Sequence, residues 1–124
     1  MLFRSDPILG PRLSYDGTVT EWQRDIGVVE RALHSGHQIG FVRLLAGTSF
    51  IEIVRAAVYA TAKKQPFRID RAKFHTFCFI DDETSNIRLQ VSLKMSIGAI
   101  NISSQRDDQV GWLSHADMRA CVAE

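Results

Sequence analysis

The chain has 124 residues, of which 45% are hydrophobic and 23% charged, with a formal net charge of +1. This length fits one domain, residues 1–124, and the composition is that of a folded globular protein rather than a disordered one. Acidic and basic residues are mixed along the chain, and no stretch reaches the ~18 apolar residues of a membrane span, so we expect neither nucleic-acid nor membrane binding.

The first third of the chain predicts short strands separated by turns. Prolines and a glycine interrupt the first eleven residues, and we expect a short edge strand near Arg12–Ser14. Asp16-Gly17 is a turn signal, after which β-branched and aromatic residues favour a strand over Thr18–Ile26. Glycines and polar residues then predict a loop over Ala32–Gly40, which leads into a short strand over Phe41–Leu45.

The next segment predicts a long helix over Phe50–Lys64. Gly47-Thr48-Ser49 precedes it and offers hydroxyl groups that can cap the free N–H groups of its first turn. The segment contains no glycine or proline, and Gln65-Pro66 ends it. Small and apolar residues recur at helical spacing, and a lone helix dominated by them needs covering on most sides. These residues are Phe50, Ile53, Val54, Ala57, Val58 and Ala60 or Thr61.

After Pro66 the hydrophobic period changes from 3.6 to 2, which predicts strands. Phe67–Arg71 and Lys73–Ile80 both have strand character, and a polar turn follows them. Ile87–Met95 alternates apolar and polar residues, as is typical of a half-buried strand. Ala99–Ser104 and Trp112–Val122 predict two more strands. A strongly curved antiparallel sheet wrapped around one long central helix satisfies this order, and this α+β arrangement is the hotdog fold.

The candidate groups for chemistry are four histidines and the acids near the helix. The entry to the helix N-terminus follows nine residues after His37, so this side chain can face a substrate channel that ends at helix N–H dipoles. A surface loop histidine is the alternative. His34 and His37 have no third ligand cluster beside them, so we expect no metal site. His75 and His115 lie in predicted strands, where we expect hydrogen-bonded structural residues.

The N-terminus and the cysteines both favour a cytoplasmic location. Charges and Pro7 stand where a signal peptide would need an apolar run. Cys78 and Cys121 have neither metal nor redox spacing, so we expect both to be small core-filling thiols in a reducing compartment; a disulfide between them is the alternative.

The run from His37 to Glu52, HQIGFVRLLAGTSFIE, resembles the active-site stretch of polyketide-synthase and animal fatty-acid-synthase dehydratase domains. In that family HxxxGxxxxP is followed by GTxFVE and the hotdog helix. Residues 6–10, DPILG, look like the family's opening HPLLG; residues 87–91 look like its VQLQV strand; and residues 112–116 look like its closing W-x-x-H-A strand. The resemblance covers the whole chain and points to the His-bearing N-terminal half of such a dehydratase.

The resemblance implies β-elimination of water from a β-hydroxyacyl thioester on the phosphopantetheine arm of an acyl carrier protein, a lyase reaction with no bound cofactor. His37 is then the general base that removes the α-proton, while an acid protonates the departing hydroxyl. The backbone N–H near Phe41 and the helix N-terminus at Gly47–Thr48 hold the thioester carbonyl. The acyl channel is then lined by Leu44, Leu45 and Phe50. The alternative is that these residues simply fill the core.

The chain departs from the family pattern at three points. Phe41 stands at the motif glycine and Ala46 at the motif proline, and either change can weaken or abolish catalysis. In the synthases the catalytic aspartate comes from a second hotdog, and this chain ends before one begins. A homodimer offers another acid, because stand-alone bacterial dehydratases pair the loop histidine with a helix glutamate of the other subunit. Glu52 has that glutamate's offset, five residues after Gly47; the alternative is a first-turn residue favoured by the helix dipole.

The sequence therefore leaves three hypotheses open. The first is a 3-hydroxyacyl-carrier-protein dehydratase half, active as a homodimer or with a second-hotdog partner. The second is a catalytically inactive hotdog that binds a thioester or acts as a scaffold. The third is a truncated fragment of a larger synthase.

Overall fold

The computed structural model describes residues 9, 12–15, 19–26, 38–39, 42–43, 47–62, 67–76, 78, 87–106 and 110–122. Side chains are described within these ranges except at 13–15, 38–39, 42–43, 47–49, 62 and 122. In chain order the elements are β1 (Arg12–Tyr15), β2 (Val19–Asp25), β3 (Gln38–Ile39), β4 (Val42–Arg43), α2 (Gly47–Ala62), β5 (Phe67–Phe74), β6 (Ile87–Lys94), β7 (Ala99–Arg106) and β8 (Leu113–Val122).

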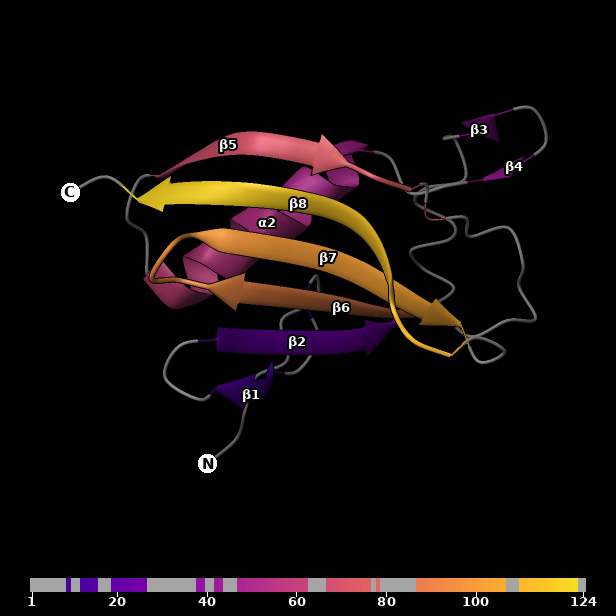
Figure 1. Cartoon of the computed structure of the whole chain (residues 1–124), viewed down its shortest axis with the longest axis horizontal. Helices are drawn as coiled ribbons and strands as arrows, with labels where there is room; N and C mark the ends of the chain where they lie inside the picture. The colour runs from indigo at the N-terminus through magenta and orange to yellow at the C-terminus, as the bar shows by residue number, and fades with distance from the viewer. Residues whose placement is uncertain are drawn as a thin grey trace.

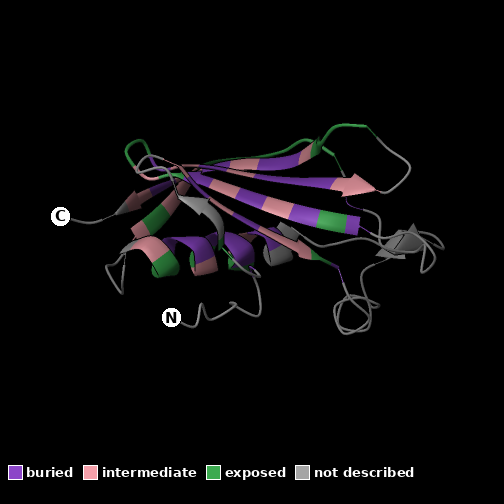
Figure 2. Ribbon diagram, turned by 90° about the horizontal axis from the view of Figure 1, so that it is seen from below, coloured by how far each residue is buried: buried purple, intermediate pink, exposed green. Residues whose placement is uncertain are grey.

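A six-stranded antiparallel sheet in the order β1-β2-β6-β7-β8-β5 forms the body of the molecule, and β3 and β4 pair separately. Helix α2 crosses one face of the sheet (Figures 1 and 2). The sequence predicted an α+β architecture in which strands precede and follow one long helix along the chain. The described residues confirm this architecture. The strands predicted near residues 12–14, 18–26, 87–95, 99–104 and 112–122 are confirmed as β1, β2, β6, β7 and β8.

Strand β6 shows why these predictions succeed. Every second residue from Ile87 to Leu93 is buried, whereas Arg88 and Lys94 are exposed. A strand that lies between β2 and β7 can bury just one of its faces against the helix, so its side chains must alternate in polarity. The alternation of apolar and polar residues in the sequence is a direct consequence of that geometry.

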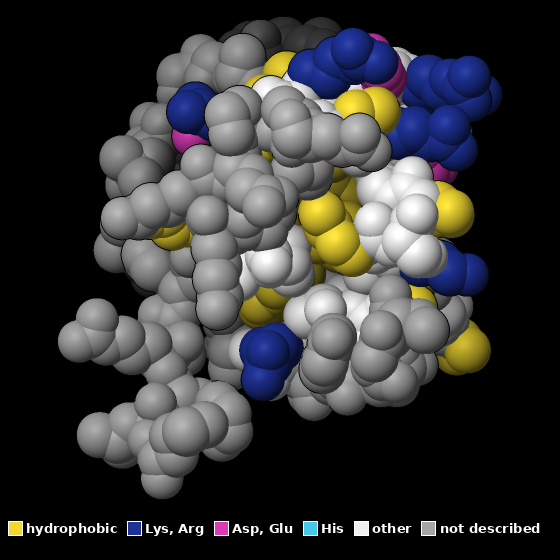
Figure 3. Space-filling model, turned by 90° about the vertical axis from the view of Figure 1, so that its left-hand side faces the viewer, with side chains coloured by type: hydrophobic (Ala, Val, Ile, Leu, Met, Phe, Trp, Pro, Cys, Tyr) yellow, Lys and Arg dark blue, Asp and Glu magenta, His cyan; other side chains and the backbone are white. Residues whose placement is uncertain are grey.

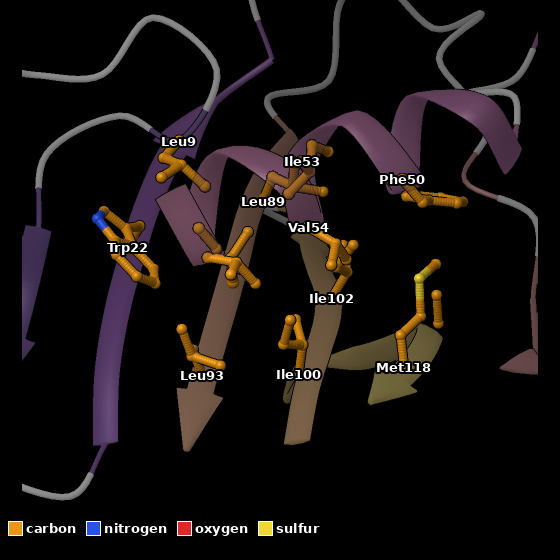
Figure 4. Close-up of a cluster of buried hydrophobic side chains, with 14 of the residues drawn as sticks. Leu9, Trp22, Phe50, Ile53, Val54, Leu89, Leu93, Ile100, Ile102 and Met118 are labelled. Atoms are coloured by element: carbon orange, nitrogen blue, oxygen red, sulfur yellow. The ribbon is translucent and has the colours of Figure 1, made fainter. Parts of the chain in front are cut away.

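The hydrophobic core lies between α2 and the sheet. Ile53 and Val54 point from the helix toward Leu89 and Ile102 of the sheet, and Phe50 lies on the side of Met118 (Figure 4). The buried stripe of α2 consists of Phe50, Ile53, Val54, Ala57 and Val58, all at most 3% exposed. At about 25 cal/mol per Å² of apolar surface removed from water, this stripe is a major contribution to folding free energy.

The expectation that α2 is covered on most sides is wrong for the described residues. The side of the helix opposite the stripe is open, with Glu52, Arg55, Tyr59 and Ala60 exposed, Tyr59 by 57%. Of the two alternatives for the end of the stripe, Ala60 is therefore outside it and Thr61 is half-buried. Alanine is small enough to occupy either face at little cost, so its presence does not report burial.

Helix α2 begins one turn earlier than predicted. It starts at Gly47 and ends at Ala62, so the three residues expected to cap it form its first turn. Whether these three residues cap the helix or form its first turn, their backbone N–H groups have no acceptor within the helix. The local sequence therefore does not distinguish a helix that starts at Gly47 from one that starts at Phe50. The first turn contains no acidic residue, because Glu52 is the sixth residue of the helix. The expected first-turn dipole effect on Glu52 is therefore wrong.

Strand β5 is one bulged strand that includes Phe67–Arg71 and the start of Lys73–Ile80, both predicted to have strand character. Its pairing with β8 shifts between Asp70 and Lys73, and Arg71 has a φ of 51°. That left-handed conformation is uncommon for a residue with a side chain, and bulges that twist an edge strand hinder its pairing with other chains. The strand ends at Phe74, so the prediction of strand over residues 75, 76 and 78 is wrong, while residues 77, 79 and 80 lie outside the described residues.

The β5 edge also carries exposed cations. Arg68, Arg71 and Lys73 are exposed, and Lys and Arg side chains gather at one corner of the face shown in Figure 3. Arg68 Nε lies 3.2 Å from Asp70 Oδ2, a contact that lowers the pKa of the Asp70 carboxyl. Cys121 Sγ also lies 3.5 Å from that oxygen.

The two cysteines differ in burial. Cys78 is 1% exposed and belongs to the core, as predicted. Cys121 is half-buried at the surface beside Asp70, so its assignment to the core is wrong; its strand neighbour Ala120 faces the core instead, and strand alternation places Cys121 on the other side. Neither Cys78 nor Cys121 forms a disulfide bond.

Candidate functional site

The predicted site residues are described to different extents. Four of them lie outside the described residues: His37, Phe41, Leu44 and Leu45. The motif position Ala46 also lies outside the described residues. The backbones of Gly47 and Thr48 form the start of α2, and Phe50 and Glu52 are described with their side chains.

A short hairpin flanks the position of Phe41. Strand β3 follows His37 directly, and β4 pairs with it in the register Ile39↔Val42. The strand predicted over Phe41–Leu45 is thus found at its centre, whereas the loop predicted over Ala32–Gly40 is wrong at Gln38–Ile39. Two short strands joined by a two-residue connection that contains glycine are a hairpin signal. The polar composition of the segment obscured that signal. The hairpin and the start of α2 lie at the same end of the molecule (Figure 1).

Phe50 anchors the first turn of α2 in the core. Its side chain is 3% exposed and its ring has two aromatic neighbours. The ring centroid is 6.2 Å from that of Phe74 and 6.1 Å from that of His115, and the His115 ring is tilted by 11° from the Phe50 plane. These separations lie in the range of favourable aromatic pairs. The start of the helix is therefore fixed to β5 and β8 at once.

His115 is buried because β8 contains a bulge. The β7–β8 register runs Ile102↔Ala116 and then Ser103↔Ser114, so His115 is an additional residue on β8. His115 and Ala116 are adjacent, yet both are 1% exposed, which regular alternation does not allow. A bulge re-aims a side chain in this way.

Both ring nitrogens of His115 are hydrogen-bonded. Nδ1 lies 2.9 Å from the carbonyl oxygen of Thr76, and because a carbonyl can only accept, Nδ1 carries the hydrogen. Nε2 of the neutral ring then accepts from Ser104 Oγ at 2.6 Å. Burial lowers the pKa of His115, and Arg106 acts in the same direction against the hydrogen bond to Thr76. His115 is thus a neutral, hydrogen-bonded residue, in agreement with its expected structural role.

A second polar cluster lies on the half-exposed side of β8. His75 Nε2 is 2.6 Å from Asp117 Oδ2, and the Asn101 amide donates to Asp117 Oδ1 and to Ser114 Oγ at 2.8 Å each. Burial acts to raise the pKa of Asp117, but the hydrogen bonds from Asn101 and His75 outweigh it and the pKa is lowered. His75 is hydrogen-bonded as expected, although it follows β5 instead of lying within a strand.

Glu52 lies on the open side of α2. Its side chain is 58% exposed, and its Oε1 is 3.1 Å from Arg55 Nη1. A surface ion pair of this kind contributes at most about 1 kcal/mol, so the carboxylate is available to a molecule approaching from outside.

Sequence reasoning missed the partners of His115. Ser104 and Thr76 carry no motif, and they approach His115 from elements that are far apart along the chain. One signal was present: Ser103-Ser104 interrupts the apolar alternation of β7, and a buried histidine needs hydrogen-bond partners.

The described part of the chain holds no group of three or more His, Cys, Asp or Glu side chains arranged to bind a metal ion. Within the same residues, no helix has the length and apolarity needed to cross a bilayer.

Comparisons with known proteins agree on one family. The model of the polyketide synthase dehydratase domain matches residues 6–105. No curated protein sequence matches the chain. Among solved structures, the dehydratase domain from the CurK module of curacin polyketide synthase has a TM-score of 0.80 at 18% identity, over 95% of this chain and 44% of that chain. GphF dehydratase 1 has a TM-score of 0.79 at 16% identity, over 94% of this chain and 44% of that chain.

Two inactive mutants of the CurK dehydratase match similarly. One replaces an aspartate by asparagine and the other a histidine by phenylalanine, with TM-scores of 0.80 and 0.78. The likeness to these structures shows a hotdog-like α+β fold, and the chain spans less than half of their length. Because the family model matches most of the sequence, the chain belongs to the polyketide synthase dehydratase domain family, as its N-terminal part.

Proposed function

We propose that this chain is the His-bearing half of a dehydratase that acts on a β-hydroxyacyl thioester carried by an acyl carrier protein. Residues 1–124 form a single hotdog domain, and His37 is the general base. The observation that carries the proposal is the family match over residues 6–105, which includes His37 and the whole of α2.

In the proposed reaction His37 removes the α-proton of the thioester and charge develops on the carbonyl oxygen. The N–H groups of Gly47 and Thr48, with that of Phe41, donate to this oxygen. The start of α2 at Gly47 supports this role, because the first N–H groups of a helix have no intrahelical acceptor and favour negative charge. An acid then protonates the β-hydroxyl, which leaves as water as the double bond forms. The proposed contacts of the acyl chain are Leu44, Leu45 and Phe50.

The acid is proposed to come from a second hotdog. The chain covers less than half of the solved dehydratases. In the CurK dehydratase, the histidine and the aspartate whose mutants are inactive lie further apart in sequence than the 124 residues of this chain. With His37 as the counterpart of that histidine, the counterpart of the aspartate falls outside this sequence. A homodimer is the other source of an acid, and the exposure of the Glu52 carboxylate supports it.

A thioester-binding or scaffold module without catalysis is the second candidate function. Phe41 and Ala46 stand at the motif glycine and proline and favour this candidate. A side chain at a glycine position narrows the space near the backbone, and the loss of proline removes a rigid turn.

We propose two features of the cellular setting. An acidic carrier protein docks by charge near the start of the acyl channel, where the candidates are Arg43, Arg55, Lys63 and Lys64. The cytoplasm is the proposed location, because neither Cys78 nor Cys121 forms a disulfide bond.

Replacing His37 tests the assignment of the base. We expect His37→Ala to slow the formation of enoyl thioester from a β-hydroxybutyryl thioester by about 10²–10⁴-fold, measured by enoyl absorbance, because a general base typically contributes this factor. His34→Ala, which changes a neighbouring histidine with no assigned role, is the matched control and keeps the wild-type rate. Equal rates for the wild type and His37→Ala contradict catalysis by this chain alone. Thioester binding without turnover in both proteins favours the binding module.

A further inference from the structure

The buried His115 joins four separate parts of the fold at one point. It belongs to β8, accepts a hydrogen bond from Ser104 of β7 and donates one to the Thr76 carbonyl beyond the end of β5. Its ring stacks on Phe50 of α2 at a centroid distance of 6.1 Å. Its backbone carbonyl also accepts from the N–H of His75 at 2.8 Å. The ring is thus fixed in position and in orientation.

Phe50 transmits this position to the start of α2. It is the fourth residue of a helix that begins at Gly47, so its ring belongs to the same turn as the N–H groups of Gly47 and Thr48. Phe74 contacts the Phe50 ring from β5, 6.2 Å away, so the first turn is fixed by aromatic contacts to β5 and β8. A helix turn is rigid enough that displacing the Phe50 ring displaces these N–H groups with it.

The bulge on β8 indicates that this arrangement is specific. Without the additional residue, alternation would direct the side chains of His115 and Ala116 to opposite faces of the sheet. With the bulge both are buried, and Ser104 and Thr76 satisfy both nitrogens of the ring. A phenylalanine would fill this space without requiring two polar partners, so packing alone does not explain a histidine here.

We propose that His115 is a positioning residue of the dehydratase site: through Phe50 it holds the first turn of α2 where its N–H groups polarise the thioester carbonyl. The inference rests on the proposed function, because it assumes that the carbonyl binds at Gly47–Thr48. His115 itself is buried and touches no substrate. Its effect is on carbonyl polarisation, since donors held in place before the reaction stabilise developing charge most strongly.

The carbonyl stretching frequency of a bound crotonyl thioester, isotope-labelled at the carbonyl carbon, reports this polarisation directly and does not depend on the folded fraction. In the wild-type chain we expect binding to lower the frequency. In His115→Phe, which keeps a ring for stacking but removes both hydrogen bonds, we expect at least half of that shift to be lost. Ser104→Ala, which removes one hydrogen bond, gives an intermediate shift. His75→Phe makes the same substitution at a side chain that bonds to Asp117, leaves the backbone N–H that donates to the His115 carbonyl in place, and keeps the wild-type shift.

The outcomes separate the two proposals. A wild-type shift in His115→Phe overturns the positioning role and leaves the proposed function intact. No shift on binding to the wild type overturns the carbonyl site, and the positioning role with it. Should His115→Phe fail to fold, Ser104→Ala decides, and a full wild-type shift in that variant overturns the positioning role.

Discussion

At the scale of single residues, burial and hydrogen bonding give the histidines different chemistry. His115 is buried with both nitrogens bonded, whereas His75 is exposed and shares a hydrogen bond with Asp117. Desolvation disfavours the charged imidazolium, and the two groups bonded to the ring, the Ser104 hydroxyl and the Thr76 carbonyl, carry no charge to compensate. Its protonation therefore costs folding free energy, and the cost appears in the pH dependence of stability.

We expect His115 to destabilise the protein in mild acid. Its pKa in the folded state lies below the ordinary value of 6.5, so between the two values the unfolded chain binds more protons. The contribution of neutral His115 to the free energy of unfolding is fully present at pH values above that ordinary pKa. It falls as the pH decreases below that pKa, by at most about 1.4 kcal/mol per pH unit. Urea denaturation at about pH 7.5 and about pH 5.5 measures the loss, which is smaller in His115→Gln because glutamine does not titrate. An equal loss in the variant contradicts this prediction.

At the scale of elements, two glycines in turns have different surroundings. Gly98, in the β6–β7 turn, has a φ of 67°, and its carbonyl accepts from the Ala120 N–H at 2.8 Å. A Cβ there would collide with the backbone carbonyl oxygen of Ala120. Gly111, just before β8, has a φ of 86° and open space where a Cβ would lie. Gly98 is thus required by both conformation and close approach, and Gly111 by conformation alone.

We expect Gly98→Ala to destabilise more than Gly111→Ala. Each variant pays about 1–2 kcal/mol for placing a side chain in the left-handed region. Gly98→Ala also forces β7 and β8 apart, at a further cost of about 1–3 kcal/mol. Urea denaturation of both variants gives the difference in the free energy of unfolding. Equal destabilisation would show that the turn can move away from Ala120 without cost.

At the scale of the whole molecule, the open side of α2 bears on which residue supplies the catalytic acid. The sheet covers one face of the helix and Glu52 lies on the other, next to Arg55. In a two-fold symmetric homodimer each site would combine His37 of one subunit with Glu52 of the other, so the residues act in trans. With a second hotdog from another source, Glu52 has no role in the reaction.

Mixing two inactive variants distinguishes these assemblies. If the site is shared between subunits, His37→Ala and Glu52→Gln are each inactive, but an equal mixture recovers about a quarter of the wild-type rate. Half of the dimers are then mixed, and each of these contains one intact site of two. Recovery is measured by enoyl absorbance after exchange of subunits. No recovery, or full activity of Glu52→Gln alone, contradicts a site in which His37 of one subunit acts with Glu52 of the other.

The sequence by itself determined the elements whose signal is periodic and local. The alternation over Ile87–Leu93 and the stripe beginning at Phe50 identified β6 and α2, because burial of one face imposes a period on neighbouring residues. The family motif around His37 likewise required no structure.

The tertiary structure alone decided the surroundings of His115 and the open side of α2. Ser104 and Thr76 meet His115 because β8 gains a residue in its register with β7. Register between strands depends on how whole elements pack, and a single additional residue reverses the direction of the side chain. Local patterns contain no record of that choice, so only the assembled sheet shows which histidine is buried at the start of the helix.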